Sequence, residues 1–480
     1  MNTKEIKPKR IRGFVFVLIL CAMIGKAQWV TIPDANFATY LQNQIPAAMS
    51  GNQLNTSSSL VSSTHSISVY GAGIADLTGV QYFTSLTYLT CQNNSLTTLP
   101  PLPGTLQTLI CSGNSMSTLP SLPGTLTYLD CSSNQLGVLP ALPGSLAHLA
   151  CRFTGLTSLP PFPHSLTYLD CSQNNITALP SFPSSLTYID CSGNGNGLTS
   201  LPSLPPNLLT LYCGSNGLFS IPSLPNTLIE LNCPNDYGLT TLPALPNSLV
   251  YLECQYNYLT SISSFPNSIK YMNIFYSYKL TSFPAWPSSL LTLDCSCSYS
   301  ITSLPALPGS LQYLDCSFTP HLTSLPALPN SLTHLGCGGD SISCFPYFPS
   351  GITVIALLPN SKFNCLPNHI PAMDAATMAY PLCSSGNSHN CSPAGLPEIQ
   401  KQETKVNLYP NPNNGVFRIE NSIEGEQIVN VVDLNGNIVK NFTFTGETEM
   451  SCSSLASGLY FVVVTDLHSS FTTRIKMLVL

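Results

Sequence analysis

The sequence predicts a repeat solenoid in which every turn adds one short strand to a parallel β-sheet. Three observations support this prediction. A unit of the form S-L-x-x-L-x-C-x-x-N-x-L-x-x-L-P-x-L-P-x recurs at a spacing of 20 to 22 residues. Around the cysteine, apolar and polar residues alternate with period 2, as in a half-buried strand. The Pro-rich segment that follows cannot be helical. Self-similarity at this period is typical of a solenoid.

About 14 turns share one register between residues 81 and 360. Ile274 and Leu357 fill the cysteine slot in two turns, and cysteine fills it in the others. Stacked leucines and cysteines form a core that no single turn can bury alone. The cysteines of this column are Cys91, Cys111, Cys131, Cys151, Cys171, Cys191, Cys213, Cys233, Cys254, Cys295, Cys316 and Cys337.

The cysteine column is predicted to consist of buried free thiols. In-register residues on adjacent parallel strands lie about 4.8 Å apart, whereas the Cβ atoms of a disulfide lie roughly 3.5–4.5 Å apart. Burial raises the pKa of a thiol and makes it inert. Cys111, Cys131, Cys151, Cys171 and Cys191 are therefore interpreted as structural core residues, and we predict no metal or cofactor.

The rest of the repeat is predicted to form a thin turn. An asparagine three residues after the cysteine is expected to hydrogen-bond the exposed backbone of its turn. The Leu-Pro-x-Leu-Pro segment is expected to run back along the convex side as extended, polyproline-like backbone. The asparagines are Asn94, Asn114, Asn134, Asn174, Asn194, Asn216 and Asn257.

Residues 1–27 are predicted to be a secretory signal peptide that is cut after Ala27. A basic stretch precedes an apolar run of 13 residues and then small residues. The alternative is a membrane anchor, but the run is short for a bilayer span. We predict no other membrane span.

Residues 28–80 are predicted to cap the solenoid. A helix is expected to begin at Pro33 and Asp34, because apolar side chains then recur at helical spacing. These side chains are Phe37, Tyr40, Leu41 and Ile45.

Residues 361–391 are predicted to cap the other end, with a short helix within 370–380. Export favours disulfides among four cysteines, and four cysteines allow three connectivities. A metal site with His369 and His389 is the alternative, but the segment has no C-x-x-C pair. The four cysteines are Cys344, Cys365, Cys383 and Cys391.

A linker over 392–404 leads to a second module over 405–480. Its segments alternate between apolar and polar residues and are separated by Asn-Gly turns. This pattern predicts a small antiparallel β-sandwich.

Two stripes of side chains are predicted on the concave face of the repeat sheet, where we expect a ligand. Tyrosines recur three residues before the cysteine slot, and acids recur one residue before it. Aromatic anchors dominate protein interfaces, and sugar rings stack on aromatic faces. The alternative is that the tyrosines only stack on one another and stabilise the sheet. The predicted binding residues are Tyr128, Asp130, Tyr168, Asp170, Tyr188, Asp190, Tyr251, Glu253, Tyr313 and Asp315.

The composition argues against several function classes. Charged residues make up 8% of the 480 residues, and the net charge is −6. Nucleic acid is excluded as a partner because no basic patch exists to neutralise phosphates. No catalytic motif or phosphate loop is present, and an open sheet offers no water-excluding pocket. We therefore predict a protein that is not an enzyme.

The unit L-x-x-L-x-C-x-x-N-x-L resembles the leucine-rich repeat, and its Leu-Pro-x-Leu-Pro segment resembles the subclass found in secreted bacterial effectors. The resemblance implies a binding or adhesion protein with an unknown protein or glycan ligand. A structural surface-coat component without a specific ligand is the alternative.

The last 75 or so residues resemble the type A sorting domain of the type IX secretion system. The family implies export by that machinery across the outer membrane of a Bacteroidota-type bacterium. It also implies removal of the domain by a sorting protease, followed by release or attachment to surface lipopolysaccharide. An Ig-like binding domain is the alternative, and Cys452 departs from the pattern. The matching residues are Tyr409, Pro410, Asn411, Pro412, Gly415, Gly436, Gly458, Tyr460 and Lys476.

Overall fold

A computed structural model describes residues 28–357, 363, 365–383, 407–411, 413, 416–420, 426–433, 437–445, 448–452, 454–466 and 472–480. The predicted signal peptide (1–27), the linker (392–404) and Cys391, Pro412, Gly415 and Gly436 lie outside these residues. The chain divides into two compact units, 1–156 and 157–480, which we describe in turn.

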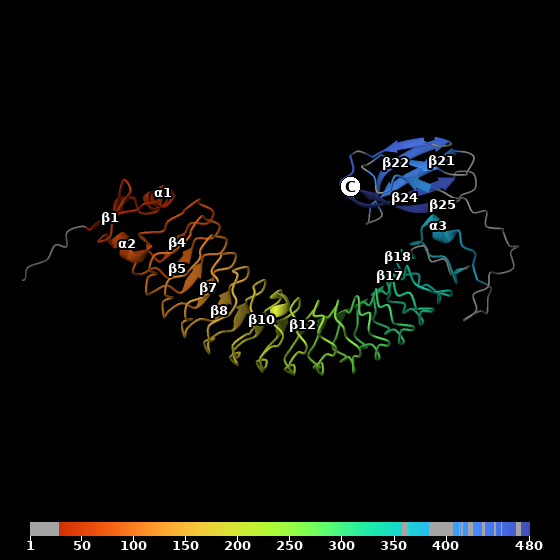
Figure 1. Ribbon diagram of the computed structural model, residues 1–480, viewed down its shortest axis with the longest axis horizontal. Helices are drawn as coiled ribbons and strands as arrows, with labels where there is room; N and C mark the ends of the chain where they lie inside the picture. Colours follow the sequence, from red (N-terminus) through yellow and green to blue (C-terminus); the bar gives the residue numbers. More distant parts are fainter. Residues whose placement is uncertain are drawn as a thin grey trace, which may run out of the picture. The chain divides into compact units, whose positions relative to one another are not determined.

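The first unit begins with the predicted helical cap (Figure 1). Asp34 caps its first helix, because its Oδ1 accepts hydrogen bonds from the backbone N–H groups of Asn36 and Phe37, both at 2.9 Å. A three-stranded antiparallel sheet in the order β1-β3-β2 accompanies the helix. The elements are β1 (Trp29–Thr31), α1 (Ala35–Gln44), η1 (Pro46–Ala48), β2 (Met49–Ser50), β3 (Gln53–Asn55), α2 (Ser59–Ser63) and η2 (Val80–Tyr82).

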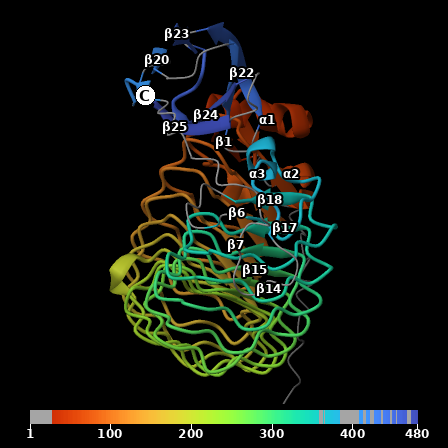
Figure 2. The same cartoon turned by 90° about the vertical axis from the view of Figure 1, so that its right-hand side faces the viewer.

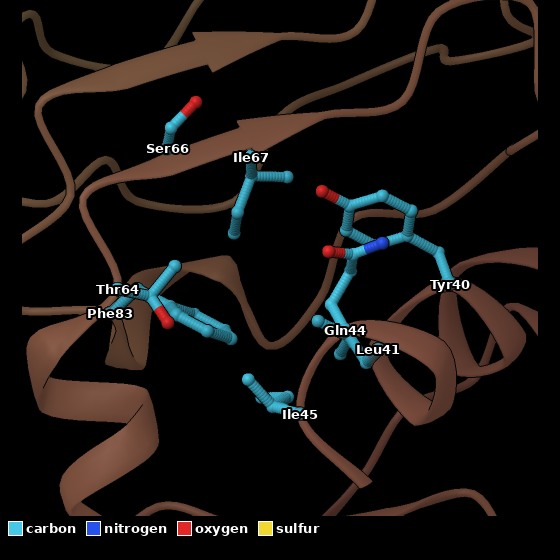
Figure 3. Close-up of a pocket in the computed structure, with 8 residues that line it drawn as sticks. All are labelled: Tyr40, Leu41, Gln44, Ile45, Thr64, Ser66, Ile67 and Phe83. Carbon is cyan, nitrogen blue, oxygen red and sulfur yellow. The ribbon is translucent and has the colours of Figure 1, made fainter.

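Figure 3 shows a small cavity of about 120 Å³ in this cap, between Tyr40 on α1 and Phe83. Leu41, Ile45 and Ile67 contribute apolar side chains to its lining. The Tyr40 side chain is held in the lining by a hydrogen bond of 3.1 Å, which its hydroxyl oxygen accepts from the Ser68 N–H. The cavity has room for a few water molecules.

Parallel strands follow in chain order, one for each turn (Figure 1). The first of them, at Ser66–Ser68, precedes the first turn that the sequence pattern shows. The strands of this unit are β4 (Ser66–Ser68), β5 (Tyr88–Thr90), β6 (Thr108–Ile110), β7 (Tyr128–Asp130) and β8 (His148–Ala150).

The second unit continues the same parallel pattern. Figure 2 shows the later strands of this unit following one another in chain order. Its repeat elements are β9 (Tyr168–Asp170), β10 (Tyr188–Asp190), η3 (Gly195–Gly197), β11 (Thr210–Tyr212), β12 (Glu230–Asn232), β13 (Tyr251–Glu253), β14 (Tyr271–Asn273), β15 (Thr292–Asp294), β16 (Tyr313–Asp315), β17 (His334–Gly336) and β18 (Val354–Ala356). Between β9 and β18, η3 is the only helical turn among the described residues, as the prolines of the return segments predict.

The inward columns around the strands are buried as far as β17, and only Ile355 and Leu357 in the last turn are partly exposed. In the turn of β7, for example, Leu126, Leu129 and Cys131 are each 0% exposed. All twelve cysteines of the column are buried, and none of them forms a disulfide. Burial raises the pKa of the Cys91 and Cys254 thiols to about 12. The structure therefore buries the column, and its inertness toward reagents stays a prediction.

The asparagine column forms the predicted hydrogen-bond ladder. The Asn134 Nδ2 donates to the Cys131 carbonyl at 2.9 Å and to the Cys111 carbonyl of the preceding turn at 3.1 Å. Its Oδ1 accepts from the Met116 N–H at 3.0 Å. One buried amide therefore satisfies backbone groups in two turns.

A second ladder was not predicted and uses the hydroxyl six residues before the cysteine. The Thr125 Oγ1 donates to the Gly104 and Leu106 carbonyls, both at 2.8 Å. Ser310 repeats the arrangement, donating to Ser288 at 2.8 Å and to Leu290 at 2.7 Å. The hydroxyl therefore ties each turn to the one before it.

Aspartate replaces asparagine in two turns, at Asp236 and Asp340. The Asp236 Oδ1 accepts from the N–H groups of Asn216 (3.0 Å) and Leu218 (3.2 Å). Its Oδ2 and that of Asp340 are buried without a hydrogen-bond partner. Burial raises the pKa of Asp236 from 3.8 to about 7 and that of Asp340 to about 8. A carboxylate supplies the acceptor of the ladder but not its donor.

The C-terminal end of the solenoid contains a disulfide between Cys365 and Cys383, and Cys344 is also disulfide-bonded. A short helix, α3 (Ala375–Met378), lies within the predicted range.

The C-terminal module is the predicted antiparallel sandwich. One sheet has the order β19-β20-β23 and the other β22-β21-β24-β25. Both sheets contribute to one core, which includes Phe417, Val431 and Val462. Cys452, the residue that departs from the family pattern, is buried in the same core. The strands are β19 (Asn407–Tyr409), β20 (Val416–Glu420), β21 (Glu426–Val432), β22 (Ile438–Thr445), β23 (Thr448–Ser451), β24 (Gly458–Asp466) and β25 (Thr472–Val479).

We predict that a thiol reagent labels few cysteines of the native protein at pH 8. Among the described free cysteines, only Cys297 is not buried, so it alone is expected to react quickly. Peptide mass spectrometry before and after denaturation measures this, and Cys297→Ser is the control that removes the rapid phase. Rapid native labelling of several cysteines of the column would contradict a buried core.

We predict that the stability of the protein falls as the pH rises from 4 toward 8. The unfolded Asp236 loses its proton near its ordinary pKa of 3.8 but the folded one only near 7, so folding binds a proton in this window. Asp236→Asn restores the missing donor and is expected to gain about 1–3 kcal/mol at pH 8.5. Urea unfolding at pH 5 and pH 8.5 measures the difference.

The matched control is Asn257→Asp, which introduces a carboxylate into the same ladder. It is expected to destabilise the protein more at pH 8.5 than at pH 5, because Asn257 now donates to the Cys233 carbonyl at 2.7 Å. Identical pH profiles for wild type and both variants would show that these carboxyls do not carry the effect.

Candidate binding face

The candidate site is the solvent side of the parallel strands, which we call the sheet face. Period 2 turns the second residue of each strand inward and the first and third outward. In β7, Leu129 is fully buried, whereas Tyr128 and Asp130 are half-buried. The structure thus places the two predicted stripes on the sheet face.

Many tyrosines of the sheet face stack on their neighbours. The Tyr168 and Tyr188 rings lie 4.4 Å apart between centroids and 6° from parallel. Tyr128 stacks on His148 at 4.0 Å and 5°. These rings use their faces to stabilise the sheet, which was the alternative interpretation of the stripe.

Two predicted tyrosines are more available. Tyr251 is 48% exposed, and its ring lies 6.2 Å from Tyr271 at 39°. Tyr313 is 36% exposed, and its ring lies 5.8 Å from His334 at 31°. Neither ring is covered by close parallel stacking, so both present aromatic surface to a ligand.

The acidic stripe has a structural task that the sequence pattern did not reveal. The Asp190 Oδ1 accepts from the Ser192 N–H at 2.9 Å and from the Ser192 hydroxyl at 2.6 Å. Asp170 makes the same contacts with Ser172, at 3.1 and 2.6 Å, and is only 9% exposed. Each acid therefore closes the turn after its strand.

Carboxylates of adjacent strands also lie in register. Asp190 pairs with Asp170, and Asp315 pairs with Asp294. Burial and the charge of Asp315 raise the pKa of Asp294, whereas its hydrogen bonds with Ser296 lower it. Burial and the charges of Asp315 and Asp294 raise the pKa of Tyr313, so its hydroxyl remains a donor. The sheet face therefore combines negative charge with phenol donors.

Polar side chains also bond across the strands. The Tyr212 hydroxyl donates to the Glu230 Oε1 at 2.7 Å, and the Asn232 Nδ2 donates to the Glu253 Oε2 at 2.5 Å. The predicted binding acid Glu253 is thus held in place by its neighbour. Among the residues that the structure describes, no cluster of three or more metal-ligating side chains occurs.

A further group of tyrosines, which the sequence analysis missed, lies beyond the strands. Tyr256 and Tyr276 stand two residues after the cysteine slot, and Tyr258, Tyr278 and Tyr299 stand four residues after it. The prediction considered only residues that alternate along the strand. Recurrence at these two loop positions was the signal that could have found them.

Residues of the sorting motif act mainly as structural ties within the C-terminal module. The Asn411 Nδ2 donates to the Lys476 carbonyl at 2.6 Å, and its Oδ1 accepts from the Leu478 N–H at 2.9 Å. The Tyr460 hydroxyl donates to the Ala456 carbonyl at 3.1 Å. Gly458 begins β24 and Tyr409 ends β19. A cis peptide bond joins Tyr409 to Pro410.

The fold and its outward face define a repeat solenoid of parallel strands with a separate C-terminal sandwich. Comparison with known proteins assigns both parts. Residues 165–186 match the leucine-rich repeat family, and residues 407–478 match the secretion system C-terminal sorting domain. No curated protein matches the chain.

One solved structure supports the same assignment, and a second is reported beside it for comparison. YopM from Yersinia enterocolitica WA-314 is 32% identical with a TM-score of 0.60, over 65% of this chain and 68% of YopM. A leucine-rich effector YopM from Yersinia pestis is 28% identical with a TM-score of 0.49, over 59% of this chain and 86% of that one. The chain belongs to the leucine-rich repeat proteins and carries a sorting domain for type IX secretion at its C-terminal end.

The sorting domain marks the chain for export to the cell surface or the medium. Among the described residues, the structure contains no helix with the length and hydrophobicity needed to cross a membrane.

We predict that Asp190→Ala destabilises the protein by about 1 kcal/mol, because the Ser192 N–H loses its acceptor. Asp190→Asn keeps a side-chain oxygen and is expected to remain near wild type. Urea unfolding of the two variants measures this. Equal stability of the alanine variant and wild type would argue against a structural role for the acid.

Proposed function

We propose that the chain is an exported binding or adhesion protein that holds a macromolecular ligand on its sheet face. The observation that carries this proposal is the exposed pair Tyr251 and Tyr313 beside an ordered row of carboxylates. Aromatic rings with a hydroxyl at the tip are favoured anchors of protein interfaces. The partner is a protein or a glycan.

We also propose an export route, based on the predicted signal peptide and the C-terminal sorting domain. Residues 1–27 direct export and are removed after Ala27. The sorting domain engages the type IX machinery and is then removed by a sorting protease. The mature solenoid is released or attached to surface lipopolysaccharide, and it acts without catalysing a reaction.

A surface-coat component without a specific ligand is the second candidate. The close stacking of Tyr168 on Tyr188 favours it, since these rings stabilise the sheet whether or not a ligand binds. The two functions differ in what the exposed tyrosines do.

We predict that Tyr251→Ala with Tyr313→Ala weakens ligand capture at least tenfold while the melting temperature stays near wild type. Both side chains are partly exposed, so their loss removes binding surface more than core. Immobilised mature chain is tested against a glycan array and surface-protein extracts, and any ligand found is titrated against both forms.

Tyr347→Ala is the matched control, because Tyr347 is 71% exposed on a return segment away from the sheet face. Capture that survives the double variant unchanged, or no specific capture at all, would favour the coat component.

A further inference from the structure

A groove lined by tyrosines runs along one edge of the second unit, beside the turns that follow β12 to β16. It encloses about 800 Å³. Ser300 and His321 complete its lining. We call it the tyrosine groove, and its six tyrosines are Tyr237, Tyr256, Tyr258, Tyr276, Tyr278 and Tyr299.

Most ring pairs of the groove meet edge to face, whereas the Tyr256 and Tyr276 planes are tilted by 33°. Tyr258 and Tyr278 have centroids 5.0 Å apart and planes at 81°, and Tyr276 and Tyr299 have centroids 5.7 Å apart and planes at 88°. A ring in such a pair covers its neighbour with an edge and leaves other faces open. Tyr237 is 55% exposed and Tyr299 42% exposed. Ring faces are therefore available here, unlike those of Tyr168 and Tyr188 on the sheet face.

Two of these tyrosines occupy a strained backbone position. The residue two after the cysteine slot has a positive φ throughout the repeats, and residues as different as Gly113, Asn235 and Phe153 fill it. Tyr256 and Tyr276 both have a φ of 58°. A bulky residue is unfavourable in the left-handed region, and such strain clusters at functional sites. Tyr256 and Tyr276 are bulky residues at this left-handed position, as Phe318 is in a later turn.

The residues that line the groove carry little charge, and this favours a neutral ligand. The eight lining residues include no carboxylate and no lysine or arginine. The Lys279 ammonium lies 4.1 Å from the centre of the Tyr258 ring and 5.9 Å from that of Tyr278. The chain thus supplies its own cation to these rings, and a cationic ligand would have to displace it. Anionic groups would meet a single lysine.

The polar atoms of the groove are hydroxyls and one imidazole. Burial and the neighbouring Tyr258 raise the pKa of Tyr278 to about 12, so its phenol keeps its proton. Phenol and serine hydroxyls both donate and accept hydrogen bonds. The apolar ring faces, with hydroxyls at their edges, match a molecule that has the same two features.

We propose that the tyrosine groove binds a neutral, linear glycan. The C–H faces of its sugar rings pack on the open tyrosine faces, and its hydroxyls bond with the phenols, Ser300 and His321. The linear form follows from the track of rings. The successive pairs from Tyr237 through Tyr258 to Tyr278 lie 5.4 and 5.0 Å apart along consecutive turns. This site is separate from the sheet face and stands independently of the function proposed for that face.

The test uses the full chain and linear hexasaccharides of glucose, mannose, xylose and galactose, with sialylated and sulfated glycans alongside. The hexasaccharide that binds best is titrated calorimetrically. Tyr258→Ala with Tyr278→Ala is expected to weaken it at least tenfold. Tyr258→Phe keeps the ring and is expected to retain most of the affinity.

Tyr256→Asn separates binding from folding. It places in this turn the residue type that Asn235 already provides at a φ of 60° in the preceding one. We expect weaker glycan binding with a melting temperature that is unchanged or higher, because the strained tyrosine is replaced. A variant that merely unfolded would instead lose both properties.

Tyr347→Ala is the control, because this residue is 71% exposed on a return segment and is expected to leave hexasaccharide binding unchanged, whereas Tyr313→Ala tests the sheet face. Four outcomes would overturn the proposal: no neutral hexasaccharide binds at millimolar concentration, binding survives the groove variants, Tyr313→Ala abolishes it, or only charged glycans bind. If the sheet-face variants lose ligand capture but still bind the hexasaccharide, the groove proposal still holds. The sheet-face proposal and the groove proposal are therefore tested separately.

Discussion

The constraint on which this structure depends is the need to satisfy the backbone where each strand leaves the sheet. Apart from the short η3, no helix covers these turns in the described part of the repeats, so most buried N–H and C=O groups there have no helical partners. Asparagine meets the need because its amide has both a donor and an acceptor. Asn134 uses both, bonding with Cys111, Cys131 and Met116. Neighbouring turns are thereby linked by side chains as well as by strand pairing.

The ladder also explains where the fold tolerates change. Thr154 and Ser277 occupy the asparagine slot and donate to the carbonyls of their own turns, at 2.6 Å each. Asp236 retains only the acceptor. Burial raises its pKa, because a carboxylate without water around it is unfavourable. The thin return segment requires the second ladder of Ser and Thr hydroxyls. In a chain with 8% charged residues, many polar side chains therefore serve the backbone.

Much of the fold could be predicted from the sequence because its signals are local and repeated. The period fixes which residues of each strand face inward, and Cys131 is buried for that reason. The strand β4 was not predicted, because the segment around Ile67 lacks the leucine and cysteine of the unit. The role of Asn411 could not be predicted either, since it bonds with a strand 65 residues away.

The candidate site was less predictable, because the same residue can serve the fold or a ligand. Alternation places Asp190 on the sheet face but does not show that its oxygen already closes a turn with Ser192. Stacking of Tyr168 on Tyr188 likewise depends on ring angles that a single sequence does not reveal.

The turns after the strands are less constrained than the strands themselves. A residue on the sheet face has an in-register neighbour on each side, so its identity is limited by packing. The position two after the cysteine needs only a left-handed backbone, which glycine or asparagine provides with little strain. Larger residues also occupy it, as Tyr256 and Tyr276 do in two consecutive turns and Phe153 does in another. The loop edge is therefore where this solenoid varies its surface without disturbing its core, and where a ligand site is gained with the least effect on folding.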